Sequence, residues 1–422
     1  MQPKATRMRV GGLALACLVP GLAIVALAAQ AGGQAPAPVS VSLTVALPDE
    51  PTAGAKLFVQ KGCVRCHALG GDESRMGPDL GRIHFPGTAL DLAGAFWNHA
   101  PVMAEKMRES KIQQPTLDSR EMADLLAFLT AYRYYVAQVG GPANPAIGKK
   151  VFEQKGCSNC HGDLATFDKR GPSLAKYRGR MSAIVLAQTM WNHGSEMATV
   201  MRSSGIAWPT FSGGEMGDLL AYVQVGGSGT SRDRVYFEPG SPRRGQTLFD
   251  SKGCLRCHAI AGLGGRPGPD LGDRGRDLLG SVASIAGLMW NHSRPMEAES
   301  VRRGLARVTF SGQEMADIIA YLYFVNYANV KAVPARGAQI FNRKCGVCHS
   351  AGGGSGIGPD LTAVKQLDDP IALFAAMWNH SARMEQELRR RGLSWPRLAQ
   401  GEAADLAAFL VSRRPAGVPA SR

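Results

Sequence analysis

Cysteine and histidine are scarce in this chain of 422 residues, which has nine of each. Eight of the cysteines form pairs of the type Cys-x-x-Cys, and the ninth, Cys17, lies in an apolar N-terminal stretch. The body of the chain therefore has no cysteine left for a disulfide framework. Alternation of apolar and polar residues is also lacking, so we expect helices throughout.

A histidine directly follows each pair of cysteines. In a Cys-x-x-Cys-His motif the two thiols can add to the vinyl groups of a haem, and the histidine can bind its iron. Zinc sites are the alternative, but they usually join two Cys-x-x-Cys pairs on one metal with histidines at another spacing. The motifs therefore predict four covalently bound c-type haems. The expected attachment residues are Cys63, Cys66, Cys157, Cys160, Cys254, Cys257, Cys345 and Cys348, and the expected iron-binding histidines are His67, His161, His258 and His349.

The haem motifs are 94, 97 and 91 residues apart, and the likeness among the repeats extends beyond them. Each repeat begins with Gly-x-x-x-Phe and continues after the haem motif with Gly-Pro-x-Leu. Trp-Asn-His-x-x-x-Met follows, and an amphipathic helix closes the repeat. A period of this length indicates a whole small domain. A covalently held haem would compensate for the small core of such a domain.

We therefore divide the chain into four units and expect a linker between the second and the third. Units 1 to 4 span residues 51–138, 142–226, 242–330 and 333–413, and the linker spans residues 227–241. The linker begins in a Gly/Ser-rich sequence, whereas the other links are short and contain proline. We expect units 1 and 2 to form one pair and units 3 and 4 another. A row of four equal units is the alternative.

Each unit resembles a class I cytochrome c. The resemblance implies an all-α fold of four tandem domains, each around one covalent haem. In that family the glycine and phenylalanine of the first helix pack against a leucine and an aromatic residue of the last helix. The matching pairs on the last helices are Leu125/Phe128, Leu219/Tyr222, Ile318/Tyr321 and Leu406/Phe409. Start signals for these helices occur at Asp118, Ser212 and Ser311, whereas unit 4 has none before Glu402, so its last helix is expected to fray.

The second axial ligand of the iron separates an electron carrier from an enzyme. The Trp-Asn-His-x-x-x-Met motif offers two candidates at spacing i, i+4, which lie on one face of a helix. The resemblance favours methionine, because class I cytochromes use it. The expected distal ligands are Met103, Met197, Met296 and Met384, and the alternatives are His99, His193, His292 and His380. The tryptophan is expected to pack at the haem edge, where its indole N–H needs a polar partner.

The N-terminal segment indicates export. Lys4, Arg7 and Arg9 precede an apolar run, so residues 1–31 read as a signal peptide or a membrane anchor. Residues 32–50 read as a flexible tether. We expect the protein in the periplasm or on the outer face of the cytoplasmic membrane, with membrane association through residues 10–31 as the alternative to cleavage.

The net charge of +14 suits steering toward acidic docking patches on redox proteins. Export argues against nucleic-acid binding. Arg302–Arg303 and Arg389–Arg391 are expected on solvated helix faces. The function expected is transfer of single electrons without enzymatic activity, with His/Met ligation raising the reduction potentials. The alternative is a haem enzyme, or a fixed subunit of a redox complex, with one substrate-binding haem.

Overall fold

The computed structural model describes residues 41–69, 76–81, 83, 87–136, 143–162, 171–177, 181–225, 240–272, 281–354 and 356–414, which all belong to one compact body. The expected signal peptide or anchor at residues 1–31 lies outside these ranges. None of the helices in the described ranges has the length and apolar character needed to span a membrane.

The four units share the same three main helices in the same order, which confirms the all-α fold. Unit 1 contains α1 (Ala53–Gln60), η1 (Cys63–Arg65), α2 (Ala89–Glu109) and α3 (Ser119–Val136). Unit 2 contains α4 (Pro145–Gln154), α5 (Ser158–His161), η2 (Leu174–Tyr177), α6 (Ala183–Ser203) and α7 (Glu215–Val225). Unit 3 contains α8 (Pro242–Ser251), η3 (Cys254–Arg256), the strands β2 (Ala259–Ile260) and β3 (Leu263–Gly264), α9 (Val282–Arg302) and α10 (Gly312–Ala328). Unit 4 contains α11 (Pro334–Lys344), η4 (Leu361–Ala363), α12 (Pro370–Arg390) and α13 (Glu402–Ser412).

The first and last helices of each unit pack closely because the first carries a glycine at the contact. A Cβ on Gly245 would lie 1.9 Å from the carbonyl oxygen of Asp317, so no other residue fits there. Beside it, the rings of Phe249 on α8 and Tyr321 on α10 are 5.5 Å apart. The other units repeat both contacts, at Gly54, Gly148 and Gly337 and in the ring pairs Phe58/Phe128, Phe152/Tyr222 and Phe341/Phe409.

Side chains hold the segment before the last helix of unit 4, although the N-cap residue of this helix, Gly401, has no side-chain cap hydrogen bond of its own. The Glu402 carboxylate accepts a hydrogen bond from the Ala399 amide at 2.8 Å, although no serine stands at residue 399. The Gly401 amide donates to Oδ1 of Asp91 at 2.7 Å, and Asp91 belongs to unit 1. A neighbouring unit therefore supplies the acceptor that the local sequence lacks.

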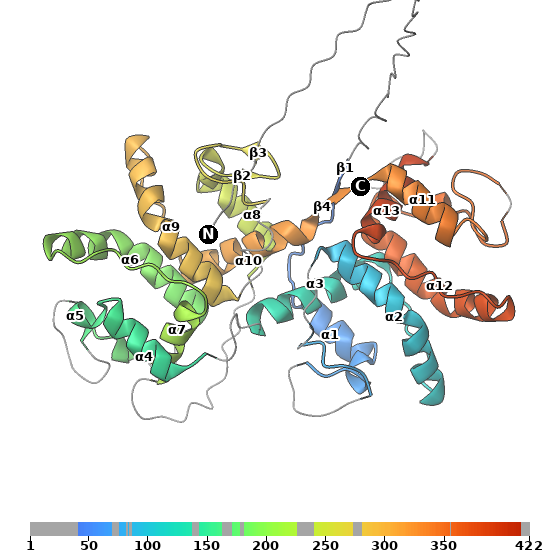
Figure 1. Ribbon diagram of the computed structural model, residues 1–422, viewed down its shortest axis with the longest axis horizontal. Coiled ribbons are helices and arrows are strands. Elements are labelled where there is room, and N and C mark those ends of the chain that lie inside the picture. Colours follow the sequence, from blue (N-terminus) through green and yellow to red (C-terminus); the bar gives the residue numbers. More distant parts are fainter. Residues whose placement is uncertain are drawn as a thin grey trace, which may run out of the picture. The chain divides into compact units, whose positions relative to one another are not determined.

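Units 1 and 4 form one pair and units 2 and 3 the other, so the expected pairing of consecutive units 1–2 and 3–4 is wrong. In the first pair, α2 packs against α12 and α13, and α12 packs against α3. In the second pair, α6 packs against α9 and α10, and α7 packs against α9 (Figure 1). The expectation rested on linker composition, whereas the contacts come from the helix that carries Trp-Asn-His.

Part of the expected flexible tether forms a strand. β1 (Val41–Thr44) pairs antiparallel with β4 (Asn329–Ala332), which connects unit 3 to unit 4, and Val41 lies opposite Ala332. Val45 is 2 % exposed, and its amide donates to the carbonyl of Ala328 at 3.0 Å. The tether therefore shares a buried junction with the link between units 3 and 4, and burial of its apolar residues accounts for the order.

The expected linker also ends earlier than predicted. Ser241 is buried, and its amide donates to Oδ1 of Asp317 at 2.7 Å. A Cβ on Gly240 would lie 2.2 Å from the carbonyl oxygen of Ala316. Residues 240 and 241 therefore pack within unit 3, and residues 227–239 lie outside the described ranges.

Candidate haem sites

The histidine of each Cys-x-x-Cys-His motif is held in one tautomer by the carbonyl oxygen of the proline in Gly-Pro-x-Leu. Nδ1 of His67 donates to the carbonyl of Pro78 at 3.0 Å. A carbonyl oxygen only accepts, so Nδ1 carries the proton and Nε2 is left to bind a metal. The other three units repeat this bond, in His161–Pro172 at 3.0 Å, His258–Pro269 at 3.1 Å and His349–Pro359 at 2.9 Å.

The glycine of Gly-Pro-x-Leu makes room for the histidine ring. A Cβ on Gly268 would lie 2.6 Å from Cε1 of His258. The Gly268 amide donates to the carbonyl of Cys257 at 2.8 Å, which ties the segment to the haem motif. The same crowding of the ring recurs at Gly77, Gly171 and Gly358. This segment therefore orients the iron-binding ring.

The eight motif cysteines are half-buried and form no disulfide within the described residues. Burial raises the pKa of Cys63, and it raises that of Cys157, Cys254 and Cys345 to about 11. The first cysteine of every motif thus faces the unit interior as a neutral thiol. In the described ranges, no three His, Cys, Asp or Glu side chains gather as metal ligands.

Unit 3 contains a cavity of about 750 Å³, a size typical of cofactor pockets. Cys254, Cys257 and His258 lie in its wall, and apolar residues of α9 and α10 line much of the remainder. The thiols, the oriented imidazole and the apolar lining fit a haem attached through both cysteines.

Both candidates for the distal ligand lie in the wall of this cavity. Met296 and His292 are one helical turn apart on α9, and Met289 of the preceding turns lines the cavity as well. Nδ1 of His292 donates to the carbonyl of Leu288 at 2.8 Å, which leaves Nε2 available. Unit 1 has Phe96 at the place of Met289, so that position cannot supply a ligand in every unit. Methionine therefore stays a prediction, with histidine as its alternative.

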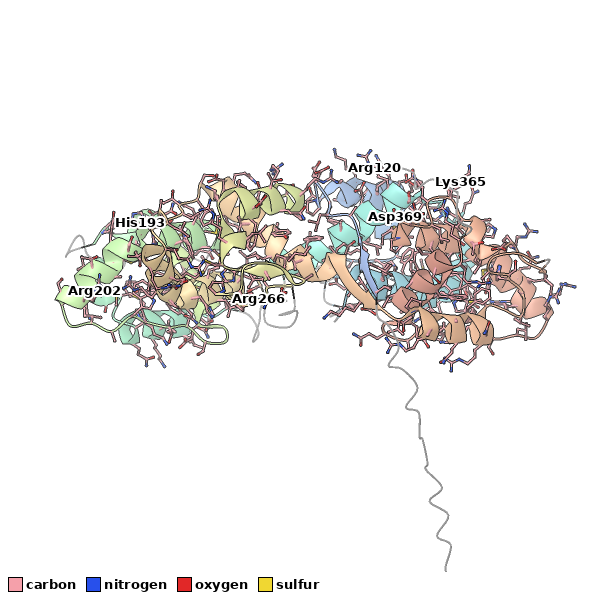
Figure 2. All side chains as sticks on the ribbon, turned by 90° about the horizontal axis from the view of Figure 1, so that it is seen from above. Arg120, His193, Arg202, Arg266, Lys365 and Asp369 are labelled. Carbon is pink, nitrogen blue, oxygen red and sulfur yellow. The ribbon has the colours of Figure 1, made fainter. Side chains whose placement is uncertain are left out.

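The methionine and histidine of the motif differ in burial in the same way in all four units. Each of the four methionines is half-buried, whereas each of the four histidines is exposed; His193 on α6 is an example (Figure 2). Met103, Met197 and Met384 pack against the hydrophobic core. This arrangement is consistent with methionine facing the haem.

The tryptophan and asparagine of Trp-Asn-His join each unit to its partner. In the pair of units 1 and 4, Nε1 of Trp97 donates to the carbonyl of Pro396 at 2.8 Å. Nδ2 of Asn98 donates to the carbonyl of Leu398 at 2.7 Å, and Oδ1 of Asn98 accepts from the Leu398 amide at 2.8 Å. Trp378 and Asn379 make the same three bonds in return, to Pro115 and Leu117. Each contact is thus made twice, as in a two-fold symmetric dimer.

Units 2 and 3 repeat the arrangement. The indole N–H groups of Trp191 and Trp290 donate to the carbonyls of Val308 and Pro209. The side-chain amides of Asn192 and Asn291 donate to the carbonyls of Phe310 and Phe211. Trp191 of unit 2 also lines the haem cavity of unit 3. The polar partner of each indole is a backbone carbonyl across the pair, and the position of the tryptophan at a haem edge stays a prediction.

A second position in each unit contacts the partner's tryptophan, and sequence reasoning missed it. It lies 17 residues after the tryptophan of its own unit, and its occupants are Gln114, Trp208, Arg307 and Trp395. Trp208 stacks on Trp290 at 4.1 Å, and Trp395 packs on Trp97 at 4.2 Å. The constant spacing of 17 residues could have revealed this position, but its residue type differs between the units.

An ion pair crosses the first pair of units. The Arg108 guanidinium of unit 1 lies 2.8 Å from the Glu385 carboxylate of unit 4, whose side chain is 7 % exposed. Arg389 contacts the same carboxylate at 2.6 Å. Burial alone would raise the pKa of Glu385, but the two guanidinium groups outweigh it and hold the pKa below its usual value.

Comparison with protein-family models matched the Cytochrome c family at residues 51–132, 242–324 and 334–414. These ranges correspond to units 1, 3 and 4. Comparisons with curated proteins and with solved structures returned no match. Cytochrome c domains carry covalently bound c-type haem and transfer electrons. The oriented histidines, the paired thiols and the crossing of first and last helices agree with this match, and the chain belongs to the cytochrome c family.

Proposed function

We propose that the chain is an exported tetrahaem cytochrome that carries single electrons between redox proteins. Bound haem supplies an iron that cycles between the ferric and ferrous states by one electron. The hydrogen bond from His161 to the carbonyl of Pro172 supports a haem in unit 2, and with it a total of four haems. Unit 2 lies outside the family match, yet it orients its histidine as the other three units do.

The protein's contribution is to hold each iron and to limit access to it. The prolines of the Gly-Pro-x-Leu segments fix the iron-binding histidines, and the matched methionines would be the second residue that holds each iron. An iron held by both residues would have no open position for a substrate, and its chemistry would be electron transfer. A haem enzyme or an enzyme subunit with one open haem is the second candidate.

We further propose that electrons pass most readily between the haems of units 2 and 3 and between those of units 1 and 4. Trp191 of unit 2 lines the cavity of unit 3, so a haem bound there would be contacted by a residue of the partner unit. Trp290 of unit 3 makes the reciprocal contact, because its indole N–H donates to the carbonyl of Pro209 in unit 2. We therefore expect Trp290 to lie beside the haem of unit 2 in the same way.

Basic residues at the surface are a reason to expect redox partners with an acidic docking surface. Arg120 of unit 1 and Lys365 of unit 4 are both exposed at the junction where Ser119 bonds to Gln366 (Figure 2). By contrast, Arg302 and Arg303 pair with Glu299, and Arg390 and Arg391 pair with Glu387, as on solvated helix faces. We propose docking of an acidic surface near Arg120 and Lys365 in the periplasm.

The haem content and the spin state test this function together. The chain is expressed in a bacterium that matures cytochromes c, with and without residues 1–31. We expect four haems per full-length chain, low-spin spectra in both oxidation states, and haem-free protein when residues 1–31 are missing. Three haems per chain would contradict the assignment of unit 2, and a high-spin haem that binds peroxide would favour the enzyme. Haem loading without residues 1–31 would contradict export.

A further inference from the structure

Four buried polar side-chain atoms without a hydrogen-bond partner occupy one position of the repeat. They are Oε1 of Gln114, Nε1 of Trp208, Nε of Arg307 and Nε1 of Trp395. Each belongs to the residue that lies 17 positions after the tryptophan of its unit. An unpaired buried polar atom is costly, so three unpaired donors at a shared position of the repeat indicate an acceptor outside the protein chain.

The haem can supply an acceptor for the three donors, whereas Oε1 of Gln114 only accepts and gains no partner from a haem carboxylate. Arg307 lines the cavity of unit 3 together with Cys254, Cys257 and His258. Tryptophan Nε1 and arginine Nε only donate, so they need an acceptor, and the haem carboxylates are acceptors. By their equivalent places in the repeat, the four residues would give the four haems different neighbours: one positive charge, two neutral donors and one amide oxygen.

Arg307 of unit 3 lies in the interface with unit 2, where it contacts Trp191. It donates to the carbonyl of Trp191, and its guanidinium carbon lies 5.9 Å from the centre of the Trp191 ring. Its NH1 is 3.3 Å from the carboxylate of Glu297, which also pairs with Arg294. Two guanidinium groups share this one carboxylate, so Glu297 does not fully neutralise Arg307.

Unit 2 carries a glycine, Gly194, opposite Arg307. A Cβ on Gly194 would lie 3.3 Å from NH2 of Arg307, closer than most real contacts. The corresponding residues of units 1, 3 and 4 are Ala100, Ser293 and Ser381. Only the unit that faces the arginine carries a glycine there.

We propose that this position sets the reduction potential of each haem and that Arg307 gives unit 3 the highest potential in the chain. The inference rests on the proposed tetrahaem function. A positive charge near the haem disfavours the ferric state, which carries one positive charge more than the ferrous state. Gln114 donates nothing from its unpaired atom, so unit 1 has the lowest potential of the four.

Redox titration of the full-length holoprotein, followed by its absorption spectrum, tests the proposal. Arg307→Trp introduces the residue of units 2 and 4, and Arg307→Lys keeps the charge. Arg390→Gln is the control, because it removes one positive charge from a side chain that is 67 % exposed. We expect the highest midpoint potential to fall in Arg307→Trp and to stay near its original value in Arg307→Lys. All four potentials should keep their values in Arg390→Gln.

The outcomes separate the possible roles of Arg307. No fall in Arg307→Trp would overturn the proposal, and an equal fall in Arg307→Lys would show that packing and not charge sets the potential. An equal fall of the highest potential in Arg390→Gln would show that the net charge of the protein, and not the position of Arg307, sets this potential. The double variant Gln114→Arg/Ser381→Gly transfers the arginine and its glycine to units 1 and 4, and it should raise the lowest potential. Fewer than four haems in the unaltered protein would contradict the proposed function and would be visible before any titration.

Discussion

Asn98 and Leu398 are 300 residues apart in the chain and are joined by two hydrogen bonds, at 2.7 and 2.8 Å. The side-chain amide of Asn98 satisfies both the amide and the carbonyl of Leu398, as a neighbouring strand would. The same pair of bonds occurs in the opposite direction between Asn379 and Leu117. The asparagine of Trp-Asn-His is therefore a pairing residue, and its presence in every unit reflects the contact between units.

The asparagines should stabilise the pairs measurably. In Asn98→Ala, the amide and carbonyl of Leu398 lose their partners within a partly buried contact. We expect the free energy of unfolding to fall by about 1–3 kcal/mol, seen as a lower denaturation midpoint of the holoprotein. Asn342→Ala, at an exposed asparagine, is the control and should leave the midpoint in place. Equal midpoints for both variants would contradict the role of Asn98.

The glycines beside the iron-binding histidines should not tolerate a side chain. In Gly268→Ala, the new Cβ would lie 2.6 Å from Cε1 of His258, so the ring must move. We expect a stability loss of about 1–3 kcal/mol and a changed spin state or potential of one haem in four. Gly312→Ala is the control in the same unit, because no atom lies within 4 Å of its added Cβ. An unchanged haem spectrum in Gly268→Ala would show that this glycine does not position the ring.

The ion pair between units 1 and 4 should make stability depend on pH. The pKa of Glu385 is lower in the folded protein than its usual value of about 4.5. The carboxylate therefore stabilises the fold fully above that pH, and the contribution is lost as the pH falls through the folded pKa. Melting temperatures of the unaltered protein should exceed those of Glu385→Gln at pH 7, and the gap should narrow toward pH 3. Glu196→Gln, at an exposed glutamate, should show no gap at either pH.

The distal ligand can be tested one unit at a time. In Met103→Ala we expect four bound haems, of which one becomes high-spin or moves to a lower potential, because His/Met ligation raises the potential. His99→Ala should keep all four haems low-spin. The reverse result, with an unchanged spectrum in Met103→Ala and a changed one in His99→Ala, would assign the ligand to histidine. Magnetic circular dichroism or electron paramagnetic resonance would read the ligands directly.

The sequence predicted contacts within a unit well, because they recur at fixed spacings. Gly245 and Phe249 were expected to meet the last helix of unit 3, and Tyr321 is where the family resemblance placed it. The proximal histidines followed from their motif, although the role of the Gly-Pro-x-Leu segment became clear only from the bond between His258 and Pro269.

Contacts between units could not be predicted, for a physical reason. Every unit carries the same self-complementary face, so Trp-Asn-His specifies that units pair but not which units pair. Features that distinguish the pairs, such as Arg307 against Gly194, occur once in the chain and leave no repeated pattern. The strand at Val41–Thr44 was missed because it is four residues long and its partner lies at Asn329–Ala332.

Cleavage between units 2 and 3 tests the central claim most directly. A protease site inserted within residues 227–239 would cut the folded holoprotein into one fragment with units 1 and 2 and another with units 3 and 4. Pairing of 1 with 4 and of 2 with 3 predicts that the fragments stay together after cleavage, with four haems in one complex on size-exclusion chromatography. The quadruple variant with alanine at Asn98, Asn192, Asn291 and Asn379 should weaken this complex. Separation of the cut but otherwise unaltered protein into two dihaem halves would contradict the account.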